Sequence, residues 1–297
     1  MSAVFENLFI FYVFLLAGFL FGKKEPKLQQ HTSILSFLLC NLLLPCKLFA
    51  NFSKNFTVSY IKSGYKLILA GIVLIVFLHF LSKLLTHFIT KNKYEKKVYE
   101  YSLTISNYSY LGYALVEGVF GEAMLTDMIA FCIFFAAYSY TVGYTKLTGE
   151  WSAKKLCNPM FISVLLGMIV GLSGLKLPEF FGSVFALASS SVAPLSMLLT
   201  GIALSAFSLK KILKNGKAYI VVALRLVVIP LIVFLLCKGL RLDYFLPLCL
   251  IVSSMPTGLN SIVFAEKAGE SPIYGARLAF LSHLFSVITF PLILYLV

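Results

Sequence analysis

Stretches of about 20 mostly apolar residues recur along the whole chain, and a helix of that length crosses the roughly 30 Å hydrocarbon layer of a bilayer. With 60% hydrophobic and 12% charged residues, the composition excludes a soluble globular protein. The segments between the stretches are too short for a soluble domain. Ten transmembrane helices are predicted, at residues 5–22, 32–51, 67–88, 98–119, 124–145, 158–175, 188–208, 218–237, 244–266 and 272–296.

The basic residues predict an orientation and exclude one class of partner. A net charge of +13 would suit nucleic acid, but the basic residues form short clusters between apolar stretches rather than one helical face. Fifteen lysines follow the odd-numbered spans, against six basic residues in the alternate loops. The positive-inside rule then predicts a multi-pass protein of the cell membrane, with both termini outside and the lipid bilayer, not nucleic acid, as its surroundings.

The cysteines and the N-terminus predict neither a disulfide or metal site nor a cleaved signal peptide. The six cysteines lie mostly within apolar stretches without metal-type spacing, so neither a disulfide framework nor a metal site is predicted. No Lys or Arg precedes the first apolar stretch, and no small-residue cleavage pattern follows it. We therefore interpret it as the first span rather than a signal peptide.

An internal repeat emerges when the sequence is shifted by 149 residues. The coinciding residues are Gly18 with Gly167, Gly22 with Gly171 and Pro45 with Pro194. With small gaps, ISNYSYLGYALVEGVFGE from Ile105 also aligns with VSSMPTGLNSIVFAEKAGE from Val252. We predict two five-helix repeats, residues 1–150 and 151–297. Because five is odd, the second repeat enters the membrane inverted, as in many secondary transporters.

Two predicted spans carry polar and helix-weakening residues where lipid offers no hydrogen-bond partner. One contains NYSYLGY from Asn107, and the other contains SSMPTGLN from Ser253. Pro256 lacks an amide hydrogen, and Gly112 and Gly258 permit unwinding. A broken helix exposes two half-helix ends. The amino-terminal end suits a carboxylate, and the carbonyl end suits Na⁺ or a proton donor.

If the two breaks cross, Asn107, Ser254, Thr257 and Asn260 converge on one small polar cavity. The alternative is a proline kink in one span and a packing face of tyrosines and serines in the other, with no ligand. The equivalent positions of the two breaks in the repeat favour the binding site.

At these motifs the chain resembles the auxin efflux carrier family, which includes plant PIN transporters and bacterial malate or malonate permeases. The resemblance covers essentially the whole chain. It is carried by GFLFGKK, NLLLPCKLF, NYSYLGYALVEGVFG, the Asn158–Pro159 pair, LRLVVIPLI and SSMPTGLNSIVFAEKAG. Ala114 stands where the family usually has proline, and Tyr108 and Tyr110 replace smaller residues. These departures bear on the substrate rather than the fold.

The resemblance implies an all-α fold of ten helices like that of bile acid sodium symporters and sodium/proton antiporters. Spans 1, 2, 6 and 7 would form a scaffold able to dimerise, and spans 3–5 and 8–10 a mobile transport unit. The broken spans 4 and 9 would cross in that unit and carry an organic anion by an elevator mechanism. By the same resemblance Asn107, Gly112, Pro256 and Asn260 are crossover positions, with Pro45 facing them from the scaffold.

Three basic residues lie within predicted spans, where charge is costly. Lys47 either snorkels to the surface or places its ammonium beside a substrate carboxylate. Arg225 lies about 12 Å along its helix beyond Lys217 and is expected to meet a carbonyl or an acid. Arg277 follows Glu270 by seven residues and either pairs with it or contacts an anion.

Acidic side chains are sparse at membrane depth, with no Asp or Glu near the middle of any span. Sodium/proton antiport, which uses buried carboxylates in that fold, is therefore disfavoured. Internal cations without carboxylates favour an anionic passenger. His79 and His283 lie within spans and either relay a proton or make an interhelical hydrogen bond.

The sequence thus predicts a secondary carrier of a small organic anion, such as a mono- or dicarboxylate, with no cofactor and with H⁺ or Na⁺ as coupling ion. The alternatives are a sodium-coupled bile acid-type symporter and a non-transporting receptor of the same fold. An enzyme is not expected, because no catalytic set lies at membrane depth. The predicted substrate site comprises Asn107, Tyr108, Gly112, Ser254, Pro256, Thr257, Asn260, Lys47 and Pro45, with Arg225 and Arg277 as anion-binding or structural charges.

Overall fold

The computed structural model describes residues 2–151 and 153–296, and within these ranges it is helical and contains no strand. Seven helical stretches are long and apolar enough to cross a membrane. They are Phe5–Lys24, Thr32–Asn55, Gly64–His87, Tyr108–Thr148, Glu179–Ser205, Gly216–Gly239 and Ile273–Leu294. An all-helical chain with several membrane spans is therefore confirmed.

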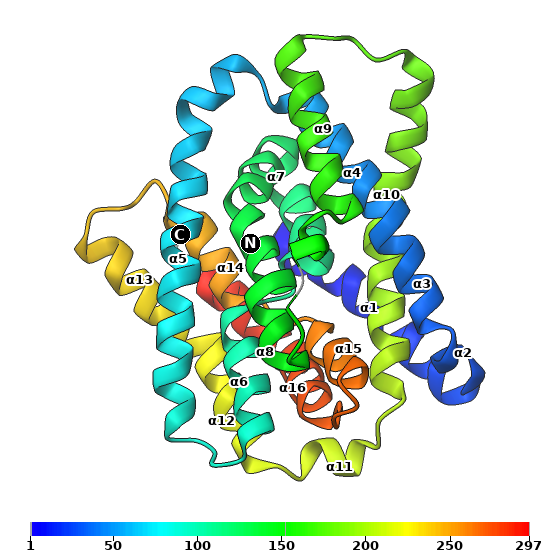
Figure 1. The fold of residues 1–297 in the computed structure, drawn as a ribbon, viewed down its shortest axis with the longest axis vertical. Helices are drawn as coiled ribbons and strands as arrows, with labels where there is room; N and C mark the ends of the chain where they lie inside the picture. The colour runs from blue at the N-terminus through cyan, green and yellow to red at the C-terminus, as the bar shows by residue number, and fades with distance from the viewer. Residues whose placement is uncertain (1, 152, 297) are drawn as a thin grey trace.

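Short helices connect and interrupt the long ones (Figure 1). The first half contains α1 (Ser2–Lys24), α2 (Lys27–Gln30), α3 (Thr32–Leu38), α4 (Leu44–Asn55), α5 (Val58–His87), α6 (Lys93–Thr104), α7 (Tyr113–Tyr138) and α8 (Tyr144–Thr148). The second half contains α9 (Pro159–Ser173), α10 (Glu179–Ser205), α11 (Leu209–Leu213), α12 (Gly216–Ala223), α13 (Ile229–Gly239), α14 (Leu246–Ser254), α15 (Asn260–Lys267) and α16 (Ile273–Leu294). Single wider or tighter turns join some of them: η1 (Leu39–Leu43), η2 (Tyr108–Gly112), η3 (Ser139–Gly143), η4 (Ala153–Leu156) and η5 (Leu224–Val228).

Four of the predicted spans, 4, 5, 6 and 9, are joined, short or interrupted in the structure. Spans 4 and 5 were expected as two separate helices, and the stretch Tyr108–Thr148 consists of two helices that meet at a kink at Gly121. Gly121 has φ 84°, a backbone conformation that glycine adopts without a Cβ clash. Span 6 corresponds to α9, which has only 15 residues, and span 9 to the two short helices α14 and α15.

Two of the wide, π-helical turns lie just before a proline within a span. The turn η1 precedes Pro45, and η5 precedes Pro230. A proline ring clashes with the carbonyl four residues earlier and cannot donate to it. Widening the turn moves that carbonyl aside, so each helix continues across the proline instead of ending there.

Helices α1 and α10 pack closely because glycines remove the side chains between them. A Cβ on Gly18 would lie 2.1 Å from the carbonyl oxygen of Leu198, and a Cβ on Gly201 would lie 2.0 Å from that of Leu15. Neither distance is possible for a real side chain. The two backbones therefore approach as in small-residue contacts between membrane helices.

Helices α9 and α4 make the same kind of contact. A Cβ on Gly167 would lie 2.9 Å from the carbonyl oxygen of Phe49, and a Cβ on Gly171 would lie 2.5 Å from that of Phe56. Gly167 and Gly171 are the residues that the 149-residue shift matches to Gly18 and Gly22. Matched glycines in the two halves thus make equivalent helix contacts.

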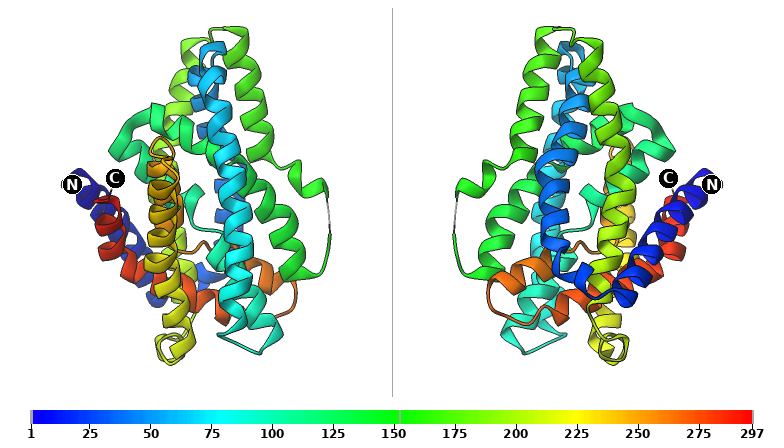
Figure 2. Two further views of the ribbon diagram at one scale, coloured as in Figure 1. Left: turned by 90° about the vertical axis from the view of Figure 1, so that its left-hand side faces the viewer. Right: turned by 90° about the vertical axis from the view of Figure 1, so that its right-hand side faces the viewer.

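The helices form two groups that meet at the centre of the molecule. In Figure 1 the helices α3, α4, α9 and α10 lie on one side, and α5, α6, α12, α13 and α14 on the other. The two termini lie side by side at one edge, where α1 and α16 run together (Figure 2). The Tyr12 hydroxyl meets that of Ser286 at 2.5 Å across these two helices.

We predict that Gly201→Ala lowers the melting temperature, because the new methyl group would collide with the backbone of α1. Overpacking of this kind costs about 1–3 kcal/mol. Gly182→Ala on the same helix is the matched control, since no atom lies within 4 Å of a Cβ there. It should leave stability unchanged or raise it by about 0.5–1 kcal/mol through helix propensity. Thermal unfolding in detergent measures both; equal melting temperatures would contradict the close contact.

Candidate functional site

The two interrupted segments lie side by side. Ser106 and Thr257 form an isolated antiparallel bridge, and the Asn107 amide donates to the Pro256 carbonyl at 2.8 Å. Helix α14 ends at Ser254 because Met255 precedes proline, which favours the extended conformation that Met255 adopts (φ −67°, ψ 150°). Each break thus provides hydrogen-bond partners for backbone groups of the other, as burial in an apolar layer requires.

Arg225 fixes the carbonyl ends of the two half-helices that lead into the breaks. Its side chain is fully buried and donates three hydrogen bonds to backbone carbonyls. The acceptors are Leu103 near the end of α6 (2.8 Å), Val252 in α14 (2.9 Å) and Met255 just beyond it (3.1 Å). The positive charge lies where both helix dipoles are negative. Of the two expected partners of Arg225, a carbonyl or an acid, the structure shows carbonyls.

Helix α16 supports both breaks from behind. The Ser282 hydroxyl accepts a hydrogen bond from the Thr257 amide at 3.0 Å and lies 3.1 Å from the Thr257 hydroxyl. One residue later, His283 Nε2 lies 3.2 Å from Asn107 Nδ2. Both contacts are buried, so α16 orients one residue in each break.

The half-helices that leave the breaks begin at one small cavity of about 60 Å³. One wall comes from Asn107, Tyr108, Ser109 and Tyr110, at the start of η2 and α7, and another from Gly258, Leu259 and Asn260, at the start of α15. The amides of a helix's first turn have no acceptor within the helix. Two sets of such amides, with the positive ends of two dipoles, therefore adjoin the same space.

One hydroxyl in this cavity has no partner. Ser106 is 3% exposed, lines the cavity, and its Oγ makes no hydrogen bond to any described residue. An unpaired buried hydroxyl is costly unless a ligand or water satisfies it. Another wall is mostly apolar and comes from α4 and α9, through Leu48 of α4 and Met160, Phe161 and Val164 of α9.

The structure places only part of the predicted set in the cavity. Asn107, Tyr108 and Asn260 line it, and Asn260 Nδ2 also donates to Ser139 Oγ at 3.3 Å. Pro256 contributes its carbonyl to the bridge rather than a surface to the cavity. From α4 it is Leu48, three residues beyond the expected Pro45, that reaches the lining.

The predicted convergence of Ser254 and Thr257 on the cavity is wrong. The Ser254 hydroxyl donates to the Leu250 carbonyl of its own helix at 2.6 Å, and Thr257 faces α16. Gly112 is also a packing position, since a Cβ there would lie 2.6 Å from the Met255 sulfur. Small polar residues beside a break point to either side of it, and the sequence does not specify which.

The lining also contains residues outside the predicted site set, among them Ser106, Tyr140, Asn158 and Gly258. Ser106 and Gly258 directly adjoin residues in the predicted set, so their places in the breaks were a usable signal. Asn158 caps α9 by accepting from the Phe161 amide at 3.0 Å. Nothing in the local sequence indicates that this cap, or Tyr140 from η3, borders the cavity.

Lys47 does not snorkel to the surface. It is 2% exposed and forms an ion pair with Glu117 of α7. The idea of internal cations without carboxylates is therefore wrong for Lys47. The error arose because Glu117 lies 70 residues away and at the end of its predicted span, so only the tertiary packing brings it to Lys47.

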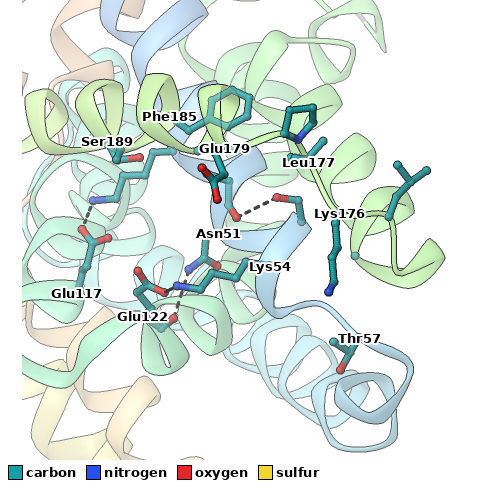
Figure 3. A pocket seen from close by; sticks show the side chains of 18 of the residues that line it. Asn51, Lys54, Thr57, Glu117, Glu122, Lys176, Leu177, Glu179, Phe185 and Ser189 are labelled. Atoms are coloured by element: carbon teal, nitrogen blue, oxygen red, sulfur yellow. Dashed lines mark hydrogen bonds and ion pairs between the residues drawn. The ribbon is translucent and has the colours of Figure 1, made fainter.

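A cleft of about 930 Å³ surrounds this ion pair (Figure 3). Its lining includes Lys47, Asn51 and Lys54 from α4, Glu117 and Glu122 from α7, and residues of α10 such as Ser189. Lys54 pairs with Glu122 at 2.6 Å. Acidic and basic groups alternate in this cleft, and Asn51 donates to the Glu122 carbonyl at 3.3 Å.

Arg277 does not take the predicted partner. Its Nε donates to the Lys211 carbonyl at 3.1 Å, and the guanidinium lies 5.9 Å from the centroid of the Tyr274 ring. Pairing with Glu270 is not found. Arg277 is remote from the cavity lining and attaches α11 to α16.

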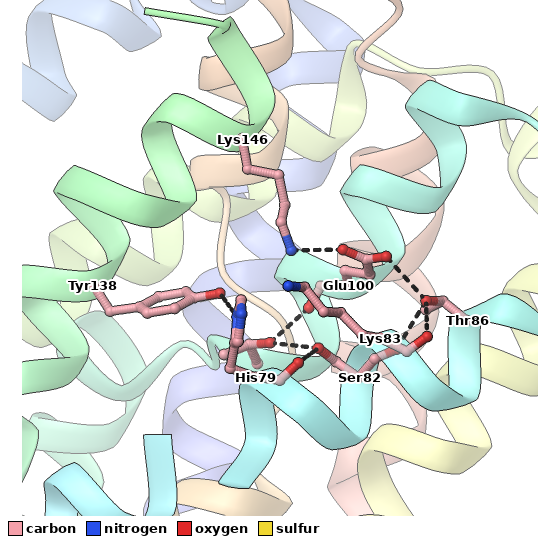
Figure 4. A network of polar contacts seen from close by, with 8 residues as sticks. His79, Ser82, Lys83, Thr86, Glu100, Tyr138 and Lys146 are labelled. Carbon is pink, nitrogen blue, oxygen red and sulfur yellow. Dashed lines mark hydrogen bonds and ion pairs between the residues drawn. The ribbon is translucent and has the colours of Figure 1, made fainter. Parts of the chain in front are cut away.

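A polar network joins residues of α5, α6, α7 and α8 (Figure 4). Lys146 pairs with Glu100 at 2.6 Å, and both side chains are mostly buried. Thr104, the last residue of α6, donates to Ser82 of α5 at 2.9 Å. His79 Nδ1 meets the Tyr138 hydroxyl at 2.7 Å, the interhelical hydrogen bond that was one expectation for this histidine. Among the described residues no group of three or more His, Cys, Asp and Glu side chains could hold a metal ion.

Apolar spans, paired helix breaks and a buried polar cavity define a multi-pass membrane protein of the transporter class. The chain matches the membrane transport protein family twice, over residues 3–152 and 145–294. It belongs to this family, the auxin efflux carrier family that its motifs resemble. The family is one of transporters, not of enzymes.

Two curated relatives are similar over most of their length. The uncharacterized transporter MJ1031 of Methanocaldococcus jannaschii is 28% identical over 254 residues, which cover 79% of this chain and 80% of the relative. The uncharacterized transporter YfdV of Escherichia coli is 22% identical over 299 residues, which cover 95% of this chain and 94% of the relative.

We predict that Arg225→Met strongly destabilises the protein, because it leaves three buried carbonyls without a donor at about 1–3 kcal/mol each. Arg225→Lys should recover only part of this loss, since one ammonium cannot reproduce the planar fork. Arg277→Met, which removes one hydrogen bond outside the core, is the control and should cost at most about 1 kcal/mol. Melting temperatures in detergent compare the three variants. Equal values for Arg225→Met and Arg277→Met would refute the role of Arg225.

Proposed function

We propose that the protein is a secondary active transporter that moves a small organic anion, such as a mono- or dicarboxylate, across the membrane. The observation that carries the proposal is the cavity between the two breaks. The beginnings of two half-helices, the unpaired Ser106 hydroxyl and the carboxamides of Asn107 and Asn260 all border it.

This set of groups is suited to a carboxylate. Free first-turn amides and the positive ends of two dipoles attract an anion, and the Ser106 hydroxyl can donate to one carboxylate oxygen. The opposite dipole ends are already neutralised by Arg225. A cation at the cavity would meet positive helix ends, which disfavours sodium as the primary passenger.

We propose for the chain a ten-span architecture of two inverted repeats, residues 1–150 and 151–297, with α6–η2–α7 and α14–α15 as the crossover helices. The support is the double family match and the equivalent glycine contacts of α1 with α10 and of α9 with α4. The positive-inside pattern supports termini on the outside.

In this proposal α1, α3, α4, α9 and α10 form a scaffold, and the remaining long helices form the transport unit. The cavity lies on the transport unit and its apolar wall on the scaffold. A space of about 60 Å³ holds only a few water molecules, so the two units must separate to admit a dicarboxylate. Rigid sliding of one unit along the other, as in an elevator, would open it. The exposed apolar surface of the scaffold, such as Phe180 and Leu187 of α10, is available for a homodimer contact or for lipid.

The test is uptake of radiolabelled malonate and malate by proteoliposomes. We predict that Asn107→Ala reduces uptake to background, because the carboxamide between the two breaks is lost. Asn41→Ala, which removes only a hydrogen bond to Phe37 of the same helix, should keep wild-type uptake. Full transport by Asn107→Ala would refute this site.

Two further measurements separate the proposal from its alternatives. Uptake that requires Na⁺ at every pH would identify a sodium-coupled bile acid-type symporter instead. Binding of malonate without accelerated counterflow would identify a receptor, since a protein that only binds cannot speed exchange across the vesicle membrane.

A further inference from the structure

His283 contacts a residue that lines the cavity, so its protonation state can change the groups that the cavity offers to a ligand. The imidazole is 2% exposed and contacts two partners. Nδ1 lies 2.7 Å from the Ala279 carbonyl oxygen, and Nε2 lies 3.2 Å from Asn107 Nδ2. A carbonyl can only accept a hydrogen bond, so Nδ1 carries a hydrogen. In the neutral ring, Nε2 then offers a lone pair and accepts from the Asn107 amide group.

This contact dictates which end of the Asn107 side chain is free. The carboxamide has one donor end and one acceptor end. With neutral His283 holding the NH₂ end, the oxygen Oδ1 is left for other partners. Asn107 itself lines the cavity, and His283 lies behind it. A carbonyl oxygen directed at a carboxylate repels it, so this state is unsuited to the anion.

We propose that His283 is the proton-binding site that couples proton movement to anion binding, and that it acts by rotating the Asn107 carboxamide. A proton taken from water adds an N–H at Nε2, while the ring keeps its N–H at Nδ1. Two donors then face each other, and a half-turn of the carboxamide removes the conflict: Oδ1 accepts from Nε2–H, and the NH₂ group turns toward the cavity. The site gains a donor and one positive charge. This inference rests on the proposed function.

The recorded contacts of the His283 ring include no acidic side chain that could balance the charge added by protonation, so the bound anion balances it. Neither recorded partner of its ring within the described part of the chain is an acid. The titratable and charged groups on the elements packed against α16 are bound to other groups or lie at the ends of their helices. They include Tyr12 on α1, Glu179 at the start of α10, Glu95, Tyr99 and Glu100 on α6, Lys210 and Lys211 on α11, Lys217 and Tyr219 on α12, Arg225 on η5, Cys249 on α14, Glu266 and Lys267 on α15, and Arg277 on α16 itself.

The contacts of three of these groups are examples. Tyr12 bonds Ser286, Glu100 pairs with Lys146, and Arg225 binds three carbonyls. A buried imidazolium without a counterion is costly, and so is a buried carboxylate. Each charge offsets the desolvation cost of the other when both enter together. Proton and anion therefore bind cooperatively, which is the condition for symport.

The first test follows the imidazole directly. Protein labelled with ¹⁵N in its four histidines is studied by NMR in detergent, and His283→Gln assigns the His283 signals. At pH 8 His283 should show the neutral form with hydrogen on Nδ1. Adding malonate at pH 6 should increase the imidazolium fraction, because anion and proton binding are linked. An imidazole that stays neutral at every pH, with and without malonate, would overturn the proposal.

The second test measures transport between pH 5.5 and 8 in proteoliposomes that contain the dye pyranine. Wild-type affinity for malonate should rise as pH falls, by about tenfold per pH unit where the free ring is neutral, since one proton binds with each anion. Uptake should acidify the lumen. His283→Gln keeps a hydrogen-bond partner for Asn107 but cannot titrate, so its uptake should be independent of pH and move no proton.

His79→Gln is the matched control, because His79 is also a histidine within a span but binds Tyr138 instead. It should retain the wild-type pH profile. Wild-type uptake that is equal at all pH values, or an unchanged profile in His283→Gln, would overturn the coupling and leave the proposed transport intact. Absence of malonate and malate binding and uptake at every pH would overturn the proposed function itself.

Discussion

The arrangement of the centre depends on the buried guanidinium of Arg225. Its three hydrogen bonds hold the carbonyl ends of α6 and α14, two segments that are about 150 residues apart in sequence. Without a donor at that point, two broken helices could not end in an apolar layer, because their last carbonyls would be unpaired. With it, both chains can leave the helical conformation and pair with each other through Ser106 and Thr257.

The chemistry of the cavity then follows from the polar groups at the start of the outgoing half-helices that have no hydrogen-bond partner. The first-turn amides of η2 and α15 and the Ser106 hydroxyl adjoin one space, while Arg225 neutralises the negative dipole ends of α6 and α14. Helix α16 adds the adjustable element. Ser282 holds one break through fixed hydrogen bonds, and His283 holds the other through a nitrogen whose role changes with protonation. The hydrogen-bonding character of the cavity thus depends on residues of α16 that do not line it.

The contacts within a helix group differ from those at the boundary between the groups. Glycine contacts join α1 to α10 and α9 to α4 at backbone distance, which resists sliding of these helices past each other. Between the groups the cavity wall is mostly apolar, through Leu48, Met160 and Phe161. The ion pair of Lys47 with Glu117 is a polar link between α4 and α7, at the edge of the large cleft.

The sequence by itself determined the helical membrane class, the family and the location of the two breaks, because apolar length, proline chemistry and glycine spacing act locally. It also predicted that Asn107 and Asn260 meet at one cavity between the breaks, which both residues line in the structure. Only the tertiary structure decided which side of a break each polar residue faces: Ser254 turned to its own helix and Thr257 to α16. The same holds for Glu117 beside Lys47 and for His283 beside Asn107, which come from segments 70 and 176 residues away. Such partners are set by packing between distant helices, and a local pattern carries no record of them.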